Sequence, residues 1–266
     1  MNLAASLLLF LGLAAANPAG PDFVSEHPKA RVEDWRHREA EINAALADPA
    51  RLKAVRVLFV GDSITELWLR GLNDWAPGQT YGRKLWQESF ARPGSANVAL
   101  NLGVSSDRTE HVLFRILPKA QGGLGELDAP QLDPDVIVLM IGINNAWAPN
   151  KLAADSVYAG VRKVLIALHE RRPRARIVLQ SLLPVASEAS NRLVVLSVNK
   201  RLVALAKSQP QASYAHYLDL YPAFVDDKGR QDRSLFNDGL HPNEAGYRRW
   251  RDKLVPFLAE VRKKKR

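Results

Sequence analysis

Residues 54–66 have the sequence AVRVLFVGDSITE, in which an apolar run ends in a glycine and polar residues follow at once. The run has the length of one β-strand, and Val57 to Val60 are apolar without alternation. A continuous apolar run is typical of a strand that is buried on both faces of a parallel sheet. Four further runs of strand length follow, at 96–103, 135–142, 176–183 and 216–220.

Between and around these runs, apolar residues recur with the period of an α-helix. Four such faces consist of Val32, Trp35, Ile42 and Leu46; Val157, Val161, Val164 and Leu168; Val195, Val198, Leu202 and Leu205; and Tyr247, Trp250, Leu254, Leu258 and Val261. Strands that alternate with helices predict βαβ crossovers, and so a parallel sheet with helices on both faces. Residues 118–134, rich in Pro and Gly, are predicted to form a long surface loop.

The N-terminus carries a different signal. Residues 2–16 have no charged side chain, and a Leu-rich core is followed by three alanines. The stretch is shorter than the ~20 residues that span a bilayer, so it predicts a secretory signal peptide over 1–20 and export to the periplasm or the medium. Because no Lys or Arg precedes the core, a buried N-terminal helix or an uncleaved anchor is the alternative. Residues 21–53 then form a linker and an N-terminal helix, and 54–266 one α/β domain.

Composition excludes several classes of chemistry. The 266 residues include no cysteine, which excludes disulfides, thiolate catalysis and cysteine-ligated zinc. No pair of histidines has the spacing of metal ligands, so neither a metal nor another cofactor is predicted. No run beyond the leader approaches membrane length, and the mature chain is expected to have no transmembrane segment.

The formal net charge is +9, and two clusters, at 171–176 and 262–266, account for an excess of that size. Clusters of this kind favour a solvated loop and tail over nucleic-acid binding, which usually needs a basic stripe with base-reading groups. Attraction of the tail to a polyanion is the alternative.

Three of the predicted strands end in glycine, at Gly61, Gly103 and Gly142. Ligands of open α/β sheets bind beyond the carboxyl ends of the strands, so the residues after these glycines are the first site candidates. Ser63 follows Gly61 and can act as a nucleophile if a base removes its proton. Taken by itself, this segment favours the alternative that Ser63 is a helix N-cap.

Two further candidates follow the second and third strands. The N–H of Gly103 and the side-chain amide of Asn144 are placed where they can donate to a developing oxyanion. Each also has an ordinary structural interpretation, as a turn glycine and a turn asparagine.

The best candidate base is His241, in the loop before the last amphipathic helix. Asp238 lies three residues upstream, and a one-turn loop lets its carboxylate reach the imidazole. A carboxylate on one ring nitrogen leaves the other free to accept the serine proton.

Together these residues resemble the SGNH-hydrolase superfamily, also called the GDSL family. Its pattern is Ser in a GDS motif, then Gly, then Asn in a GxN motif, then His in a DxxH motif, which here are Ser63, Gly103, Asn144, and Asp238 with His241. The words FVGDSITE, NLG, DRTE and VLMIG are similar to bacterial relatives of the platelet-activating-factor acetylhydrolase catalytic subunits.

The resemblance implies a three-layer α/β/α, flavodoxin-like fold and hydrolysis of short acyl esters, often acetyl, without a cofactor. In this mechanism His241, oriented by Asp238, deprotonates Ser63, while the N–H groups of Ser63 and Gly103 and the amide of Asn144 hold the oxyanion. Three positions depart from the family. Close relatives usually have glycines where this chain has Ser105 and Ser106, and Thr where it has Ile143.

Export and a basic surface favour an acetylated glycan or another small extracellular ester as substrate. A lysophospholipase- or thioesterase-type acyl hydrolase, or a non-catalytic glycan-binding protein that kept the fold, are the alternatives. Trp68, Trp147 and Phe236 lie near the motif loops and are candidates either for lining the site or for packing. The sequence makes no prediction of the oligomeric state.

Overall fold

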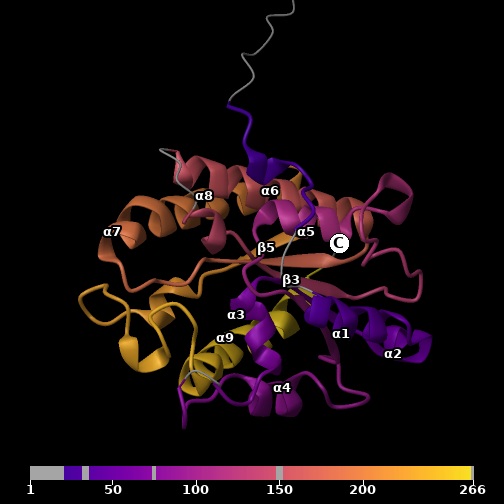
Figure 1. Cartoon of the computed structure of the whole chain (residues 1–266), viewed down its shortest axis with the longest axis horizontal. Coiled ribbons are helices and arrows are strands. Elements are labelled where there is room, and N and C mark those ends of the chain that lie inside the picture. Colours follow the sequence, from indigo (N-terminus) through magenta and orange to yellow (C-terminus); the bar gives the residue numbers. More distant parts are fainter. Residues whose placement is uncertain (1–20, 32–35, 74–75, 148–151, 265–266) are drawn as a thin grey trace, which may run out of the picture.

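The computed structural model describes residues 21–31, 36–73, 76–147 and 152–264 (Figure 1). The strands of its sheet are β1 (Val57–Gly61), β2 (Ala99–Gly103), β3 (Val136–Met140), β4 (Arg176–Gln180) and β5 (Ala215–Leu218). All four pairings are parallel, and the order across the sheet is β2-β1-β3-β4-β5. This confirms the predicted five-stranded parallel sheet, and its strand order is that of flavodoxin-like folds.

Helices cover both faces of the sheet, so the predicted three-layer architecture is also confirmed. Figure 1 shows α5, α6 and α8 on one side of the strands and α1, α2, α4 and α9 on the other. The α-helices are α1 (Arg36–Leu46), α2 (Pro49–Ala54), α3 (Ser63–Glu66), α4 (Arg83–Ser89), α5 (Thr109–Ile116), α6 (Ala153–Arg171), α7 (Glu188–Ser190), α8 (Leu196–Lys207) and α9 (Glu244–Lys263). A π-helical segment, Asn191–Val195, leads into α8.

Short 3₁₀ helices complete the connections between these elements. They are η1 (Val24–Glu26), η2 (Leu67–Leu69), η3 (Lys119–Gln121), η4 (Ile143–Asn145), η6 (Gln211–Ser213), η7 (Tyr221–Phe224) and η8 (Arg233–Leu235). Two of them return in the description of the site below. They are η1, in the N-terminal segment, and η4, which directly follows β3.

The strands are buried because their side chains meet a helix layer on either face. Every residue of β1 and β3 is buried, as expected from continuous apolar runs. The strands are shorter than the apolar runs that predicted them. The first run begins at residue 54, for example, whereas β1 begins at Val57. The chain leaves β1 to form β2 on one side and β3 on the other. The ends of β1 and β3 therefore mark the switch point, where ligands of such sheets bind.

The aromatic residues near the motif loops divide between core and surface. Trp68 is fully buried, and its ring centroid lies 4.7 Å from that of Tyr247 and 5.2 Å from that of Trp250. Phe236 is also buried, whereas 49% of Trp147 is exposed. The packing interpretation therefore holds for Trp68 and Phe236, and Trp147 remains a candidate for contacting a substrate.

The predicted surface loop 118–134 lies partly beneath the surface. It contains η3, but Leu127 and Leu132 are buried in the main core. The Arg172 guanidinium donates to the Leu127 carbonyl at 2.7 Å and helps hold this loop against the domain. The prediction of a loop was right, and its placement wholly at the surface was wrong, because its leucines pack inward.

The arginines at 171–176 are also more than solvated charges. Arg171 forms an ion pair with Asp128, and Arg174 forms one with Asp133 at 2.7 Å. Arg176 donates to the carbonyl of Lys264 at 2.5 Å, which joins the two basic clusters of the sequence. The interpretation of this cluster as a solvated loop agrees with Arg174, whose side chain is 70% exposed, while Arg171 and Arg176 also bind neighbouring segments.

Two sequence predictions fall outside the described residues. The predicted leader, 1–20, is one, and the positions 32 and 35 of the first apolar helix face are the other. Within the part of the chain that the structure describes, no helix is long and apolar enough to cross a membrane.

Candidate active site

Ser63 lies at the first turn of α3, directly beyond β1. The carboxylate of Asp62 accepts a hydrogen bond from the N–H of Ile64 at 3.0 Å and so caps the helix. Ser63 was the residue considered for the N-cap, but Asp62 has this role. The Ser63 hydroxyl therefore remains available. First-turn N–H groups of a helix have no partner within the helix, and that of Ser63 is one of them.

His241 and Asp238 lie against this serine, although 178 residues separate Ser63 from His241. His241 Nε2 is 2.9 Å from Ser63 Oγ, and His241 Nδ1 is 2.6 Å from Asp238 Oδ2. The other Asp238 oxygen accepts the backbone N–H groups of Leu240 and His241, at 3.0 and 2.8 Å. The carboxylate thus both shapes the loop and orients the ring.

Burial alone would raise the pKa of Asp238, but hydrogen bonds from the His241 ring and backbone outweigh it and hold this pKa below its ordinary value. The carboxylate is therefore ionised at neutral pH. An ionised oxygen against Nδ1 favours the tautomer that carries its proton there. Nε2 is then a proton acceptor that faces the serine hydroxyl.

Asn144 lies on η4, directly after β3. Gly142 turns the chain at this point with a φ of +121°, a conformation that L side chains rarely adopt. The Asn144 amide donates to the carbonyl of Asp107 at 2.9 Å. Asn144 thus joins the end of β3 to the turn formed by residues 104–107. This turn is called the oxyanion turn below, because the proposed function uses one of its N–H groups as an oxyanion donor.

Within the oxyanion turn, Asp107 donates its N–H to the Val104 carbonyl at 3.1 Å. Ser106 has a φ of +63°, the third-position conformation that type II turns reserve for glycine. The N–H of Ser105 is bound by Glu66 at 2.8 Å. Of the N–H groups in the turn, that of Ser106 has no hydrogen-bond acceptor among the described residues.

The structure contradicts the donor role expected for Gly103. Its N–H is donated to the side-chain oxygen of Asn101 at 2.7 Å, so it is not available to an oxyanion. Its lack of a side chain has another reason, because a Cβ here would lie 2.5 Å from the N of Glu66 and 2.8 Å from the carbonyl carbon of Thr65. Gly103 therefore lets α3 pack closely on β2.

The model of one protein family, the GDSL-like Lipase/Acylhydrolase family, matches residues 59–249, which include all of these groups. The chain belongs to this family.

Relatives among known proteins agree with the family assignment. The chain is 30% identical over 196 residues to the human platelet-activating factor acetylhydrolase IB subunit alpha1, an alignment that covers 73% of this chain and 71% of that protein. With the rat alpha2 subunit it is 32% identical over 192 residues, 72% of this chain and 70% of the relative. The chain is thus a carboxylic ester hydrolase of the GDSL family.

Solved structures share the fold at lower identity. A putative acylhydrolase from Bacteroides fragilis superposes with a TM-score of 0.61 at 20% identity, over 87% of this chain and all of that one. An acetyl xylan esterase superposes with a TM-score of 0.55 at 20% identity, over 77% of this chain and all of the other. These similarities support the flavodoxin-like architecture of the acylhydrolase.

Sequence reasoning missed the buried charges behind the oxyanion turn of this acylhydrolase. Arg115 on α5 donates to the Asp107 carboxylate at 2.8 Å, to Glu126 at 2.6 Å and to the carbonyl of Leu102 at 2.8 Å. All four residues are buried. A signal was present, because an arginine in the apolar run Val112–Ile116 is expected to have a charged partner when it is buried.

Two carboxyl groups at the site have raised pKa values. Burial, chiefly, raises the pKa of Asp62 to about 7, and the nearby charge of Asp107 adds to the effect. Burial also raises the pKa of Asp107 to about 6, although the positive charges of Arg115 and Arg31 oppose it. Carboxyl groups whose protonation changes near neutral pH therefore lie next to Ser63 and in the turn of residues 104–107.

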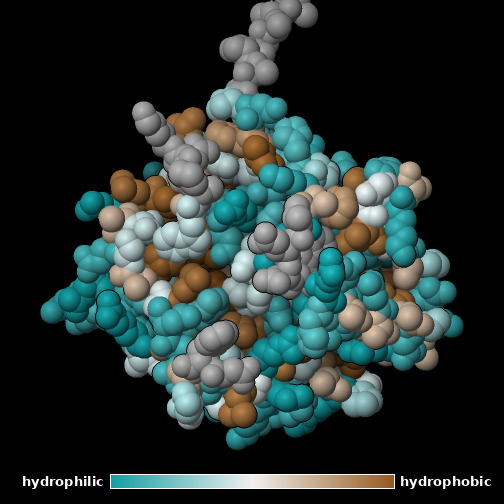
Figure 2. Space-filling view, viewed as in Figure 1, coloured by the Kyte–Doolittle hydropathy of each residue, from teal (hydrophilic) through white to brown (hydrophobic). Residues whose placement is uncertain are grey.

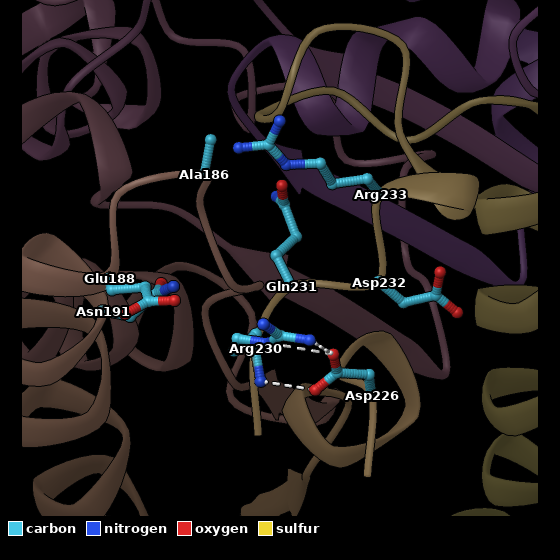
Figure 3. A pocket seen from close by; sticks show the side chains of 8 residues that line it. All are labelled: Ala186, Glu188, Asn191, Asp226, Arg230, Gln231, Asp232 and Arg233. Atoms are coloured by element: carbon cyan, nitrogen blue, oxygen red, sulfur yellow. Dashed lines mark hydrogen bonds and ion pairs between the residues drawn. The ribbon is translucent and has the colours of Figure 1, made fainter. Parts of the chain in front are cut away.

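A polar cavity of about 410 Å³ lies behind the loop of Asp238 and His241 (Figure 3). Figure 3 shows the Gln231 amide pointing toward Ala186, with the Arg233 guanidinium beside it. The Gln231 amide donates to the Gly239 carbonyl at 2.8 Å, so the cavity and this loop share a wall. The lining residues are Ala186, Glu188, Asn191, Asp226, Arg230, Gln231, Asp232 and Arg233.

Proposed function

We propose that this acylhydrolase is a serine esterase that cleaves short acyl esters, acetyl esters above all, with Ser63, His241 and Asp238 as its triad. The observation that carries the proposal is the continuous path from Ser63 Oγ through His241 to Asp238, with contacts of 2.9 and 2.6 Å. A serine, an imidazole and a carboxylate in this arrangement are the groups that nucleophilic ester cleavage requires.

The reaction follows from these contacts. As Ser63 Oγ attacks the ester carbon, its proton passes to His241 Nε2, and the carbonyl oxygen becomes an oxyanion. Collapse of this intermediate breaks the bond to the alcohol, which takes the proton from His241 and leaves acyl-Ser63. Water then attacks the acyl carbon with His241 again as base, which releases the acid and restores the serine.

Three donors serve the oxyanion in this proposal. They are the N–H of Ser63 at the start of α3, the second N–H of the Asn144 amide, and the N–H of Ser106. Ser106 replaces Gly103, whose N–H is bound by Asn101. Donors already held in place before the reaction need no reorganisation when the negative charge forms, which is why they accelerate it.

We infer that the alcohol part of the substrate is a carbohydrate. The cavity of Figure 3 supports this, because all but one of its eight lining side chains carry polar atoms, as hydroxyl-rich ligands require. Trp147, half-exposed and three residues from Asn144, has an apolar ring on which a sugar can stack. A structurally similar protein is an acetyl xylan esterase.

A second candidate, hydrolysis of longer acyl chains as in lysophospholipases and thioesterases, has its own support. Leu72, Leu193 and Leu196 are 70, 64 and 45% exposed, on segments that follow β1 and β4. Figure 2 shows separate apolar patches on the face of the molecule that is viewed in Figure 1. Exposed leucines of this kind can contact a hydrocarbon chain.

Hydrolysis of p-nitrophenyl esters from acetate to laurate tests both candidates. The proposal predicts turnover that is highest for acetate and is lost in Ser63→Ala. A maximum at long chains would favour the second candidate. Equal release by the wild type and Ser63→Ala would contradict the serine mechanism altogether.

Export belongs to the same proposal. We propose that residues 1–20 are a cleaved leader and that 54–266 form the catalytic domain, which acts in the periplasm or outside the cell. Residues 21–53, predicted as a linker and first helix, contain η1, α1 and most of α2. Sequencing the N-terminus of the protein from its expression host is the test. A chain that still begins at Met1 in the cytosolic fraction would contradict the proposed cleavage.

A further inference from the structure

The N-terminal arm, defined as residues 21–31, lies outside the region 59–249 that matches the family. It packs on α5 and α6, which Figure 1 shows beside it. The buried hydroxyl of Ser25 donates to the Ser156 carbonyl on α6 at 2.7 Å, and the N–H of Lys29 donates to a carbonyl of α5 at 3.0 Å. These contacts give the end of the arm a defined position.

Arg31, at that end, reaches the oxyanion turn. Its Nη1 donates to the Ser105 carbonyl at 2.5 Å and lies 3.5 Å from the Asp107 carboxylate. The side chain is 17% exposed. Hydrogen bonds from a charged donor that is largely removed from water are stronger than neutral ones.

Several side chains hold the oxyanion turn in place by hydrogen bonds, and Arg31 is one of them. Glu66 accepts both the N–H and the hydroxyl of Ser105 at 2.8 Å. Asn144 holds the Asp107 carbonyl, and Arg115 holds the Asp107 carboxylate. These bonds occupy the groups on either side of Ser106 and leave its N–H for the substrate.

We propose that Arg31 is a positioning residue, which fixes the oxyanion turn and thereby aims the Ser106 N–H at the reacting oxygen. This inference rests on the proposed esterase function. It means that a segment outside the family domain completes the active site. Fixing a donor before the reaction accelerates the chemical step more than it strengthens the binding of a small substrate.

The charge of Arg31 adds a second, pH-dependent effect through Asp107. The Arg31 guanidinium lowers the pKa of this buried carboxyl, which burial has raised to about 6. The turn needs the ionised carboxylate, so its support is lost as pH falls through that value. Without Arg31 the loss begins at higher pH. The charged and titratable groups that face Asp107 are Arg31, Asp62, His111, Arg115 and Glu126.

The test compares Arg31→Ala, Arg31→Lys and the matched control Lys29→Ala, in full-length protein with p-nitrophenyl acetate. For Arg31→Ala we expect kcat to fall about tenfold with KM within threefold, because the turn would lose the charge-assisted hydrogen bond that Arg31 donates to Ser105. The acidic limb of kcat should shift to higher pH. Arg31→Lys keeps the positive charge and should return the acidic limb of kcat to its wild-type pH. Lys29→Ala should behave as the wild type.

A kcat within twofold of the wild type, with the same acidic limb, would overturn the role of Arg31. So would an equal loss in Arg31→Ala and Lys29→Ala, because the arm would then act only as a structural anchor. Labelling of Ser63 by a fluorophosphonate probe gives a second rate that needs no ester, and Arg31→Ala should slow it to a similar degree. Ser63→Ala runs in parallel, and full activity in that variant would reject the proposed function independently of Arg31.

Discussion

Replacement of Asp238 by Asn tests the orientation of the catalytic base without removing the loop cap. The asparagine oxygen can still accept the N–H groups of Leu240 and His241, which Asp238 now accepts at 3.0 and 2.8 Å. Its NH₂ group, however, would face His241 Nδ1, where the carboxylate lies at 2.6 Å. The ring would then carry its proton on Nε2 and be unable to accept one from Ser63.

The size of the effect follows from the exposure of the carboxylate. Two opposite charges about 4 Å apart attract by about 1 kcal/mol in water and by about 4 kcal/mol near a protein surface. The Asp238 side chain is 52% exposed, so we place the loss of transition-state stabilisation at about 2–3 kcal/mol. That corresponds to a fall in kcat of roughly 30- to 150-fold. Buried triads lose about 10⁴-fold on the same substitution.

The assay is steady-state hydrolysis of p-nitrophenyl acetate by the wild type, Asp238→Asn and a matched control, Asp48→Asn. Asp48 accepts the N–H groups of Ala50 and Arg51 at the start of α2, away from the proposed site, so its variant should keep the wild-type kcat. A fall of less than threefold for Asp238→Asn would show that Asp238 only shapes the loop. A fall near 10⁴-fold would refute the argument from solvent screening.

Four further substitutions test neighbouring features. Asn144→Ala should lower kcat about 10²–10³-fold with a small change in melting temperature. Asn145→Ala loses buried hydrogen bonds to Thr109 and Glu110 and should instead lower the free energy of unfolding by about 2–3 kcal/mol. The opposite pattern would exchange the roles of the two asparagines. Ser106→Gly should raise the free energy of unfolding in urea by about 1 kcal/mol, because the serine is held at a φ of +63°. An unchanged urea midpoint would argue against strain at this residue. The pKa of Asp62 is raised to about 7, so the folded state binds a proton more tightly than the unfolded state, and this group makes stability fall as pH rises from about 4 to about 7. Asp62→Asn should remove that decrease in urea titrations at pH 4.5 and 7.5, and an identical pH slope in the two proteins would contradict the shift.

The proposed site uses residues inside and outside the family-matched region. The groups proposed to do the chemistry lie beyond β1, β2 and β3 and in the loop before α9, all within residues 59–249. Glu66, Asn144 and Arg115, which hold the oxyanion turn, also lie within this region. Arg31 comes from the N-terminal arm, outside it.

The sequence by itself determined the class of fold and the residues whose side chains could take part in a reaction. Continuous apolar runs such as 57–60 predict strands buried on both faces, because only helices on each side can cover them. The glycine at each of three strand ends then marks one edge of the sheet. That rule, with the family resemblance, singled out Ser63, Asn144 and the pair Asp238 and His241.

Only the tertiary structure decided which groups meet and which way they point. Gly103 fits the sequence pattern of a donor, yet its N–H turns to Asn101, and the unpaired N–H belongs to Ser106. Arg31 contacts Ser105 across 74 residues, and no local pattern encodes that contact. The physical reason is that residue type sets what a group can donate or accept. The direction of a hydrogen bond depends instead on backbone angles and on packing between segments distant in the chain.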